Sequence, residues 1–434
     1  MAPGPMVAIA DILKGGHTGQ TVELRGWIHR TRTMGGKAFV VLRDATGILQ
    51  VTLAKDAVSP EAFAAAEKAL IESSAIVKGT IVADKRAPGG YEVRASDFHV
   101  VHFAEKFPIQ EDLSEEFLLD IRHLWVRSQR MTEIFRIRDS AFKAVHEYFR
   151  DQGFWEVHPP MITPAGSEGG STLFELDYFG RKAYLTQSWQ LYAEALVLAM
   201  EKIYYIGPSF RAEKSRTTRH LTEYWHAEME QAWVGMDEVI KHAEGVISHA
   251  CQVVAEDHPG DVVALGRTPE FLKAVRPPFE HMTYDDALKT LKSKGMDLEW
   301  GKDLRTLEER ALTEGKTKPV VVTHYPRVSQ AFYKARDPKH PDLVLGFDVI
   351  AGDGVGEIVG GSERETDLET IKKSLLEQGE DPKSYDWYLD SRRYGSVQHA
   401  GFGMGMERLI QWICKLEHIR DAVPFPRTPA RFSP

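Results

Sequence analysis

Between residues 20 and 103, short segments alternate apolar and polar positions with the period of two that indicates strands buried on one face. Gly, Pro and Asp residues separate the segments, and one helical stretch, residues 59–71, begins at Ser59 as its expected N-cap. Five strands with a helix between the third and the fourth predict an OB barrel, although another small β-barrel also fits the pattern. The strands are expected at residues 22–29, 38–44, 48–54, 74–83 and 91–101.

The rest of the chain mixes helical and strand patterns. Residues 130–152 repeat apolar positions on one helical face, and Gly153 ends the expected helix. Parallel βαβ repetition and the GxGxxG and GxxxxGK[ST] nucleotide loops are absent from the sequence, which favours an α+β domain on an antiparallel sheet flanked by helices. Its strands are expected at residues 154–158, 183–187, 203–211, 224–234, 320–324, 345–350, 356–359 and 399–403.

The 434 residues are enough for two or three domains with proper cores. We expect an N-terminal barrel over residues 1–105, a connector over 106–130 and a second domain over 131–434. Within the second domain, residues 235–320 look like a helical and irregular insertion. No apolar run is long enough for a transmembrane helix, and the N-terminus lacks the pattern of a secretory signal.

Charge and cysteine content limit the possible functions and the possible metal sites. The net charge of −9 argues against general nucleic-acid binding, yet residues 25–43 and 211–220 are locally basic. A net-acidic protein with basic patches can bind RNA selectively, because its acidic remainder repels RNA elsewhere. Cys251 and Cys414 are isolated, which fits a cytoplasmic protein and argues against a Cys-rich zinc site.

Residues 210–228 bring basic, acidic and aromatic side chains together at close spacing. Arg211 and Glu213 precede a basic stretch, and His220, Tyr224 and Glu228 follow it. Two strands on either side of such a loop form an open hairpin, in which the planar fork of Arg211 suits a phosphate and Tyr224 offers a flat face to a base. A solvated, charged hairpin is the plain alternative.

Residues 401–409 (GFGMGMERL) place three glycines at alternate positions of a strand, directly before a helix expected at residues 407–416. Alternate glycines remove side chains, so that a flat ligand can approach the backbone. Arg408 lies in the first turn of the helix, near the positive end of its dipole. Without a ligand, a glycine-rich strand would only lose stability.

A third pattern, residues 153–160 (GFWEVHPP), is by itself an ordinary helix–strand junction. In order along the chain, the three patterns resemble motifs 1, 2 and 3 of the class II aminoacyl-tRNA synthetases. The resemblance includes the barrel and so indicates the aspartyl/asparaginyl/lysyl subgroup, while residues 356–365 and 424–428 look specifically like the asparaginyl enzymes. It implies ATP-dependent attachment of L-asparagine to tRNA(Asn) through an asparaginyl-adenylate, with release of AMP and pyrophosphate.

The resemblance also assigns roles to individual residues. Arg211 would grip the α-phosphate, Tyr224 would stack on adenine, and Arg408 would pack on its other face and meet the γ-phosphate. Asp348 and Glu357 match an acidic pair that holds Mg²⁺, an ion that suits hard carboxylate oxygens. Arg211 and Arg408 are the expected catalytic residues, and the expected ATP-binding residues are Arg211, Glu213, His220, Tyr224, Glu357 and Arg408.

The expected amino-acid-binding residues are Glu168, Gln190, Glu228 and Arg364. Residues 187–194 (QSWQLYAE) resemble QSPQxxKQ of the aspartyl enzymes, but Ala193 stands where those enzymes carry a lysine. The resemblance then implies a pocket that has lost one cation and favours asparagine through Arg364 and an acid such as Glu228. Alternatively, Ala193 is ordinary helix filler and aspartate still binds through Arg364.

The barrel resembles the anticodon-binding domain of the subgroup. Phe39 matches an aromatic residue that stacks a central anticodon uracil, although it also fits a strand core. Arg30 and Lys37 are candidates for contacts to phosphates, and the expected anticodon contacts are Arg30, Phe39, Gln50 and Glu92. Motif 1 implies a homodimer through residues 131–160, but an amphipathic helix fits an intramolecular core equally well.

Three other functions stay open. An aspartyl-tRNA synthetase, relaxed in its choice of tRNA, would differ in the amino acid that it activates. A paralogue that makes free asparagine would lack the barrel. A non-catalytic RNA-binding relative would be free to lose the motif arginines and the acidic pair, which this sequence keeps.

Overall fold

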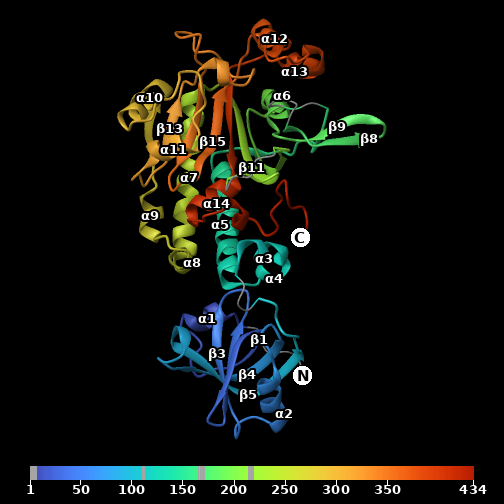
Figure 1. Cartoon of the computed structure of the whole chain (residues 1–434), viewed down its shortest axis with the longest axis vertical. Coiled ribbons are helices and arrows are strands. Elements are labelled where there is room, and N and C mark those ends of the chain that lie inside the picture. Colours follow the sequence, from blue (N-terminus) through green and yellow to red (C-terminus); the bar gives the residue numbers. More distant parts are fainter. Residues whose placement is uncertain (1–6, 110–112, 165, 167–171, 214–218) are drawn as a thin grey trace. The chain divides into compact units, whose positions relative to one another are not determined.

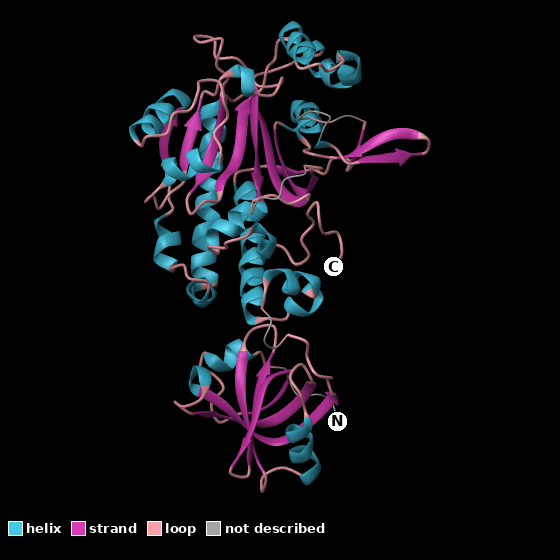
Figure 2. Ribbon diagram, viewed as in Figure 1, coloured by secondary structure: helices cyan, strands magenta, loops and turns pink. Residues whose placement is uncertain are grey.

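A computed structural model describes residues 7–109, 113–164, 166, 172–213 and 219–434. The chain divides into two compact units, Met1–Ile121 and Arg122–Pro434, and the boundary falls within the predicted connector. Figures 1 and 2 show the elements of both units. Across the described residues, the helices are all too short or too polar to cross a lipid bilayer.

The first unit contains a closed barrel with strand order β1-β2-β3-β5-β4, which confirms the predicted barrel. The structure adds the short helix α1 (Ile9–Leu13), and α2 (Pro60–Lys68) lies between the third and fourth strands. Ser59 Oγ accepts a hydrogen bond from Ala62 N, as expected of an N-cap. The strands are β1 (Thr21–Met34), β2 (Lys37–Arg43), β3 (Ile48–Ala54), β4 (Ser74–Ala83) and β5 (Tyr91–His102).

Strand alternation separates the inside of the barrel from its outside. In β2, Ala38, Val40 and Leu42 are fully buried in the barrel core, whereas Phe39 and Val41 between them are only half-buried. Successive side chains of a strand point to opposite faces. Phe39 therefore lies on the outer face of the barrel rather than in its core.

The second unit is built on an eight-stranded sheet with the order β12-β13-β14-β15-β16-β11-β10-β6. The pairs β12–β13 and β10–β6 are parallel, and the other neighbours are antiparallel, which confirms the predicted sheet. The strands are β6 (Trp155–Glu156), β10 (Lys202–Phe210), β11 (Glu223–Ala232), β12 (Glu280–Thr283), β13 (Val320–Thr323), β14 (Gly346–Ala351), β15 (Gly356–Glu363) and β16 (His399–Gly405).

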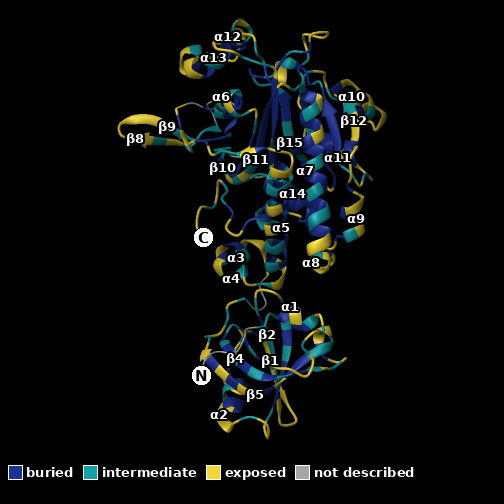
Figure 3. Cartoon of the chain, turned by 180° about the vertical axis from the view of Figure 1, so that it is seen from behind, coloured by how far each residue is buried: buried dark blue, intermediate teal, exposed yellow. Residues whose placement is uncertain are grey.

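Three helices bury one face of this sheet: α5 (Gln129–Asp151), α7 (Met236–Asp257) and α14 (Met406–Ile413). Figure 3 shows the buried central strands. The predicted apolar face of α5 is buried at Ile134, Ile137, Val145 and Phe149. Phe142 instead lies half-buried, with its ring 5.7 Å from that of Trp225. The amphipathic face of α5 thus packs inside this unit.

The segment 235–320 contributes α7, α8 (Pro259–Ala264), α9 (Pro269–Ala274), β12, α10 (Tyr284–Ser293) and α11 (Thr306–Thr313). Strand β12 was not predicted, because its four residues (EHMT) carry no apolar alternation, yet it forms an edge of the main sheet. The remaining elements are α3 (Glu115–Asp120), α4 (Arg122–Trp125), β7 (Ile162–Thr163), β8 (Glu175–Tyr178), β9 (Arg181–Leu185), α6 (Gln190–Met200), α12 (Leu368–Glu377) and α13 (Asp386–Arg393).

Candidate active site

The main sheet has one apolar face and one face that carries polar side chains and glycines. On β11, Ala227 and Met229 point into the helix-covered core, while the alternate residues His226, Glu228 and Glu230 point to the opposite face. Each of these three is paired across the ladder with a glycine of β16: Gly405, Gly403 and Gly401 respectively. The period-two pattern of the two strands thus creates the floor of a site.

The glycines of β16 make room first for neighbouring protein side chains. A Cβ atom at Gly403 would lie 2.4 Å from His226 Nε2, and one at Gly401 would lie 2.1 Å from a Glu230 carboxylate oxygen. At positions 401 and 403 the glycines therefore leave room for side chains of β11, while Gly403 and Gly405 also line a pocket, where the approach of a flat ligand stays a prediction. At Gly405 the nearest atoms to such a Cβ belong to Arg408, at 3.8 Å or more.

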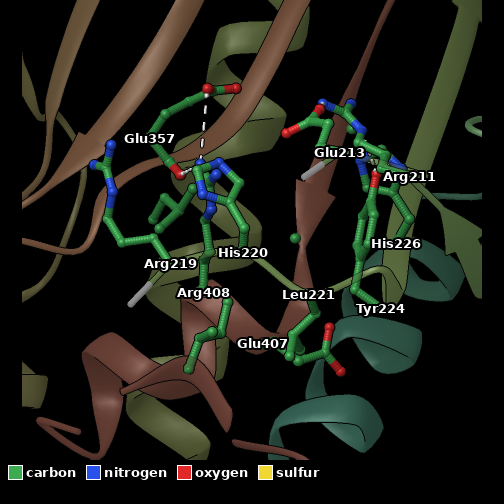
Figure 4. A pocket seen from close by; sticks show the side chains of 14 residues that line it. Arg211, Glu213, Arg219, His220, Leu221, Tyr224, His226, Glu357, Glu407 and Arg408 are labelled. Carbon is green, nitrogen blue, oxygen red and sulfur yellow. Dashed lines mark hydrogen bonds and ion pairs between the residues drawn. The ribbon is translucent and has the colours of Figure 1, made fainter. Parts of the chain in front are cut away.

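A first pocket collects the predicted nucleotide-binding residues, as Figure 4 shows. Arg211 follows directly after β10, and its Nε donates a hydrogen bond to Tyr224 OH at 3.0 Å. Glu213 Oε1 lies 3.9 Å from Arg211 Nη1. On the other side of the pocket, Arg408 donates to the backbone oxygen of Glu357. The predicted ATP-binding residues Arg211, Glu213, His220, Tyr224, Glu357 and Arg408 all line this one pocket.

Two histidines at this pocket are held in the neutral form. Burial, together with the charges of Arg408, Arg219 and Arg211, lowers the pKa of His220 to about 4. Burial and the charges of Arg211 and Arg408 lower the pKa of His226 to about 3. Burial is the main cause of both shifts, and the arginine charges add to it; a pocket with several arginines suits a polyanion.

An ion pair that the sequence did not reveal joins the pocket to helix α11. Arg219 forms an ion pair with Glu309 and donates to Thr306 Oγ1 at 2.7 Å and to Val355 O at 3.3 Å. The other oxygen of Glu309 accepts from Glu357 N at 3.3 Å. The predicted insertion therefore supplies a carboxylate that ties the motif 2 hairpin to the start of β15.

Asp348 on β14 and Glu357 on β15 converge above Gly360. A Cβ atom at Gly360 would lie 2.7 Å from Glu357 Oε1 and 3.5 Å from Asp348 Oδ1. Burial, and then the charge of Glu357, raise the pKa of Asp348 well above its usual range. A cation at this point would relieve the repulsion. The described residues contain no cluster of three or more metal-ligating side chains. Two converging carboxylates offer the hard oxygen ligands that Mg²⁺ accepts from few protein groups.

A second pocket adjoins the first and contains Gln190, Glu228 and Arg364. The Arg364 guanidinium is buried and pairs through two hydrogen bonds with Glu230, Nε to Oε1 at 3.0 Å and Nη2 to Oε2 at 2.9 Å. Its Nη1 donates to Ser362 Oγ at 2.9 Å. The positive charge predicted at Arg364 is therefore present but already neutralised by Glu230, which the motif comparison did not single out.

Glu228 fixes the turn that precedes α6. Its Oε1 accepts from Ser188 Oγ, and its Oε2 accepts from Trp189 N at 3.1 Å. Ser188 Oγ in turn accepts from Gln190 N at 3.1 Å. The structure thus brings three of the four predicted amino-acid-binding residues together, while Glu168 lies outside the described residues.

The interpretation of Ala193 needs correction. Ala193 is fully buried in an apolar cluster with Trp189, Val197 and Tyr205 and is not among the residues that line the pocket. Residues 189, 193 and 197 share one helical face, and this face packs on β10 and β11. A lysine that the sequence gave no reason to choose, Lys334, lines the pocket and hydrogen-bonds to Gln330. The resemblance to the three motifs does not reveal Lys334, because this residue lies outside them.

The predicted anticodon residues share the outer face of the barrel. The Arg32 guanidinium lies 4.8 Å from the centre of the Phe39 ring. Gln50 pairs with Glu92 across the β3–β5 ladder, and its Nε2 donates to Glu92 Oε2 at 2.9 Å. Glu92 Oε2 also accepts a hydrogen bond from Thr52 Oγ1 at 2.6 Å. Thr52 is the residue paired with Phe39 across the β2–β3 ladder. Arg30 and Lys37 are exposed.

Comparisons with known proteins agree with this arrangement. A family model described as tRNA synthetases class II (D, K and N) matches residues 114–429, and one described as OB-fold nucleic acid binding domain matches residues 22–101. The chain is 46% identical over 416 residues to the asparagine–tRNA ligase of Thermococcus gammatolerans, with 96% of both chains covered. It is 43% identical over 429 residues to that of Thermoplasma acidophilum, with 99% of this chain and 100% of the relative covered.

A solved structure gives the same result. Asparaginyl-tRNA synthetase from Pyrococcus horikoshii, complexed with asparaginyl-adenylate, matches with a TM-score of 0.93 and 46% sequence identity, over 96% of this chain and 97% of that chain. The barrel, the glycine-lined sheet face and the two adjoining pockets are thus found together with similarity over nearly the full length. The chain belongs to the class II tRNA synthetases of the D, K and N group, among the asparagine–tRNA ligases.

Proposed function

We propose that the chain attaches L-asparagine to tRNA(Asn) in an ATP-dependent reaction through an asparaginyl-adenylate. The observation that carries this proposal is that the two pockets share four lining residues: Arg211, His226, Glu357 and Gly403. A nucleotide in the first pocket and an amino acid in the second would meet at Arg211. That meeting point is where a carboxylate must reach the α-phosphorus.

In the first step, the asparagine carboxylate attacks the α-phosphorus in line, and pyrophosphate leaves. Arg211 stabilises the negative charge that develops on the α-phosphate, while Arg408 holds the far end of the nucleotide. Tyr224 supplies a flat face for adenine, and Glu213 and His220 line the edge of the same pocket. In the second step, a terminal ribose hydroxyl of the tRNA attacks the adenylate carbonyl, and AMP leaves. Positioning and charge stabilisation carry both steps.

We propose that Asp348 and Glu357 hold Mg²⁺ on the phosphates of ATP. The support is the convergence of their carboxylate oxygens above Gly360 and the raised pKa of Asp348. When bound, Mg²⁺ neutralises part of the phosphate charge. Asp348 and Glu357 would be its protein ligands, and Glu357 lines both pockets.

The choice of asparagine rests on the charges of the second pocket. Glu230 neutralises Arg364, so Arg364 offers donors to a side-chain oxygen without a net positive charge. Glu228 is an acceptor for N–H groups, which asparagine provides on its side-chain amide and on its ammonium. Lys334 in the same pocket favours the competing activation of aspartate. Glu168 remains a proposed partner of the ammonium.

A pyrophosphate-exchange assay with each amino acid tests this function. We expect exchange that depends on asparagine and exceeds the aspartate-dependent rate. Exchange with aspartate and none with asparagine would assign the chain to aspartate instead. Failure of both, together with retained tRNA binding, would point to a non-catalytic protein.

We propose that the outer barrel face around Phe39 binds the anticodon, with Gln50 and Glu92 at base edges and Arg30 at the backbone. Phe39 is half-buried on the outer face, beside exposed cations. Replacing Phe39 with Ala removes one stacking surface and should raise the KM for tRNA about tenfold, while exchange without tRNA stays normal. An equal loss in both assays would refute a role confined to tRNA.

We also propose a homodimer through residues 131–160, in a cytoplasmic enzyme. Strand β6 ends the strand order of the main sheet, and its Trp155 is 63% exposed. Both cysteines are free and buried, which suits a reducing compartment. Sedimentation of the protein and of Trp155→Glu tests the interface: a dimer that Trp155→Glu weakens is expected, and a monomeric protein contradicts it.

A further inference from the structure

Glu194, one helical turn after Gln190 on α6, lies at the centre of a buried cluster of hydrogen-bond donors. Its Oε2 accepts from Tyr388 OH at 2.8 Å and forms an ion pair with Arg392, and His399 Nε2 lies 3.2 Å from the same oxygen. The side chains of Glu194 and Arg392 are both 0% exposed. None of these four residues lines the nucleotide pocket or the amino-acid pocket.

Each donor in the cluster is itself held in place. Arg392 also donates to Glu365 O, from Nε at 3.1 Å and from Nη2 at 3.0 Å. The other ring nitrogen of His399 faces Val397 O at 2.7 Å. Burial favours the neutral acid, but Arg392 and His399 together lower the pKa of Glu194 below its usual range. Glu194 is therefore a carboxylate, which accepts hydrogen bonds and donates none.

The remaining oxygen of Glu194 determines which end of the Gln190 amide faces it. Gln190 Nε2 donates to Glu194 Oε1 at 2.9 Å. Because Glu194 only accepts, the NH₂ end of the amide must face it, and Gln190 Oε1 is directed elsewhere. No group of the described residues donates a hydrogen bond to Gln190 Oε1, and Gln190 lines the amino-acid pocket.

We propose that Glu194 is a positioning residue that presents the carbonyl oxygen of Gln190 to an N–H group of the bound amino acid. The inference rests on the proposed function of the second pocket. An acceptor at this point matches the ammonium or the side-chain amide of asparagine. The reversed amide would present a donor to an N–H group and leave both without a partner.

The variant Glu194→Gln is a direct test, because the cluster predicts how the introduced amide will sit. Arg392, which can only donate, and Tyr388 OH both donate toward the former Oε2, so the introduced carbonyl oxygen must face them. The introduced NH₂ then faces Gln190 and forces the Gln190 amide to reverse. We expect the KM for asparagine in pyrophosphate exchange to rise about tenfold, the loss of one hydrogen bond, with the KM for ATP unchanged.

A matched control is Glu244→Gln on α7. Glu244 is also a buried glutamate that accepts hydrogen bonds, from Phe279 N at 3.0 Å and from His281 Nε2 at 2.7 Å, but it lies outside both pockets. We expect this variant to leave both KM values unchanged. An unchanged KM for asparagine in Glu194→Gln, or equal increases in the two variants, would overturn the proposal.

A double-mutant cycle tests whether Glu194 acts through Gln190. If it does, the combined variant Gln190→Ala/Glu194→Gln has the same KM for asparagine as Gln190→Ala alone. Independent, multiplying effects would contradict the mechanism. Parallel assays with aspartate, which has the ammonium but no amide, show which N–H group is involved: a shift shared by both amino acids indicates the ammonium, and a shift confined to asparagine indicates the amide.

Glu194→Gln leaves Arg392 without a charged partner, which threatens folding. A second variant, Gln190→Met, keeps the pair between Glu194 and Arg392 and removes the carbonyl oxygen of residue 190. It should show the same increase in the KM for asparagine, and a normal KM would overturn the proposal. If the unmodified enzyme activates no asparagine, the proposed function fails instead, so the two failures are distinguishable.

Discussion

The two pockets of the catalytic unit differ in how far their arginines are exposed, although Arg211 lines both of them. In the nucleotide pocket, the Arg211 and Arg408 side chains remain 33% and 22% exposed. In the amino-acid pocket, the Arg364 side chain is only 4% exposed and is paired with Glu230. The Arg392 side chain near it is fully buried and paired with Glu194.

Under the proposed function, this difference matches the chemistry of the two substrates. A polyphosphate carries several negative charges, so exposed arginines can bind it through charge alone. Asparagine and aspartate differ by one amide, so a pocket that selects between them must control both net charge and the direction of each donor. Pairing every buried guanidinium with a carboxylate leaves hydrogen-bond donors in place while it removes the net positive charge.

Breaking a buried pair should have the largest effect. Arg364→Met leaves Glu230 buried without its partner, and the free energy of unfolding should fall by about 3–5 kcal/mol. Denaturant unfolding measures this change. Arg364→Met/Glu230→Leu should recover most of the stability but not the binding of asparagine. A single variant as stable as the parent would show that the pair is not a structural requirement.

Removing a partly exposed arginine should lower the rate of catalysis and leave the stability of the fold unchanged. Arg211→Ala should lower kcat/KM for asparagine activation about 10²–10³-fold, because a donor to the reacting phosphate is lost. The melting temperature should stay close to that of the parent. Arg211→Lys serves as the control, since it keeps the charge and loses the planar fork. A large loss of stability in Arg211→Ala would contradict the claim that Arg211, unlike Arg364, contributes little to the stability of the fold.

The ion pair between Arg219 and Glu309 provides a test of which contacts support ATP binding in the nucleotide pocket. Glu309→Gln weakens the contact that ties the motif 2 hairpin to β15, and the KM for ATP should rise about tenfold, with the KM for asparagine unchanged. Glu308→Gln is the matched control on the same helix, because Glu308 pairs with Arg305 instead. An equal KM for ATP in the two variants would contradict a role of α11 in nucleotide binding.

The smallest expected effect is a change in how the free energy of unfolding depends on pH. The pKa of His226 is lowered to about 3 by burial and by the charges of Arg211 and Arg408. An unfolded histidine has a pKa near 6.5, so below that pH the unfolded chain binds more protons at this residue, and stability falls as the pH falls. His226→Asn should reduce the loss of stability between pH 6.5 and 5.5 by up to about 1 kcal/mol. An unchanged pH dependence in urea unfolding would contradict the pKa assignment.

The features that follow from local patterns were predictable. Alternation predicted the barrel strands and the central strands of the sheet, and the resemblance to motifs 2 and 3 implied that Arg211 and Arg408 serve one nucleotide site. Strand β15 extends past the predicted end at residue 359 to Glu363, because two glycines that resemble a strand end are paired on both sides in the sheet. Glycine weakens a strand pattern without preventing pairing.

The buried pairs were not predictable, since their partners are far apart in the sequence. Arg364 and Glu230 are 134 positions apart, and Arg392 and Glu194 are 198 positions apart. The resemblance to the aspartyl enzymes implied that Ala193 empties a cationic position in the pocket, whereas in the described structure Glu230 pairs with Arg364 and Ala193 lies outside the pocket. Lys334 and Glu309 lie outside the three motifs, and only the tertiary fold brings them to the site.

The central claim, that paired charges give the amino-acid pocket its preference for a neutral amide, is tested most directly by Glu230→Gln. Measured by pyrophosphate exchange, the ratio of kcat/KM for asparagine to that for aspartate should fall in this variant, because Arg364 regains an uncompensated positive charge. Circular dichroism of the variant should match that of the parent. A folded Glu230→Gln enzyme with an unchanged or higher ratio would contradict the claim.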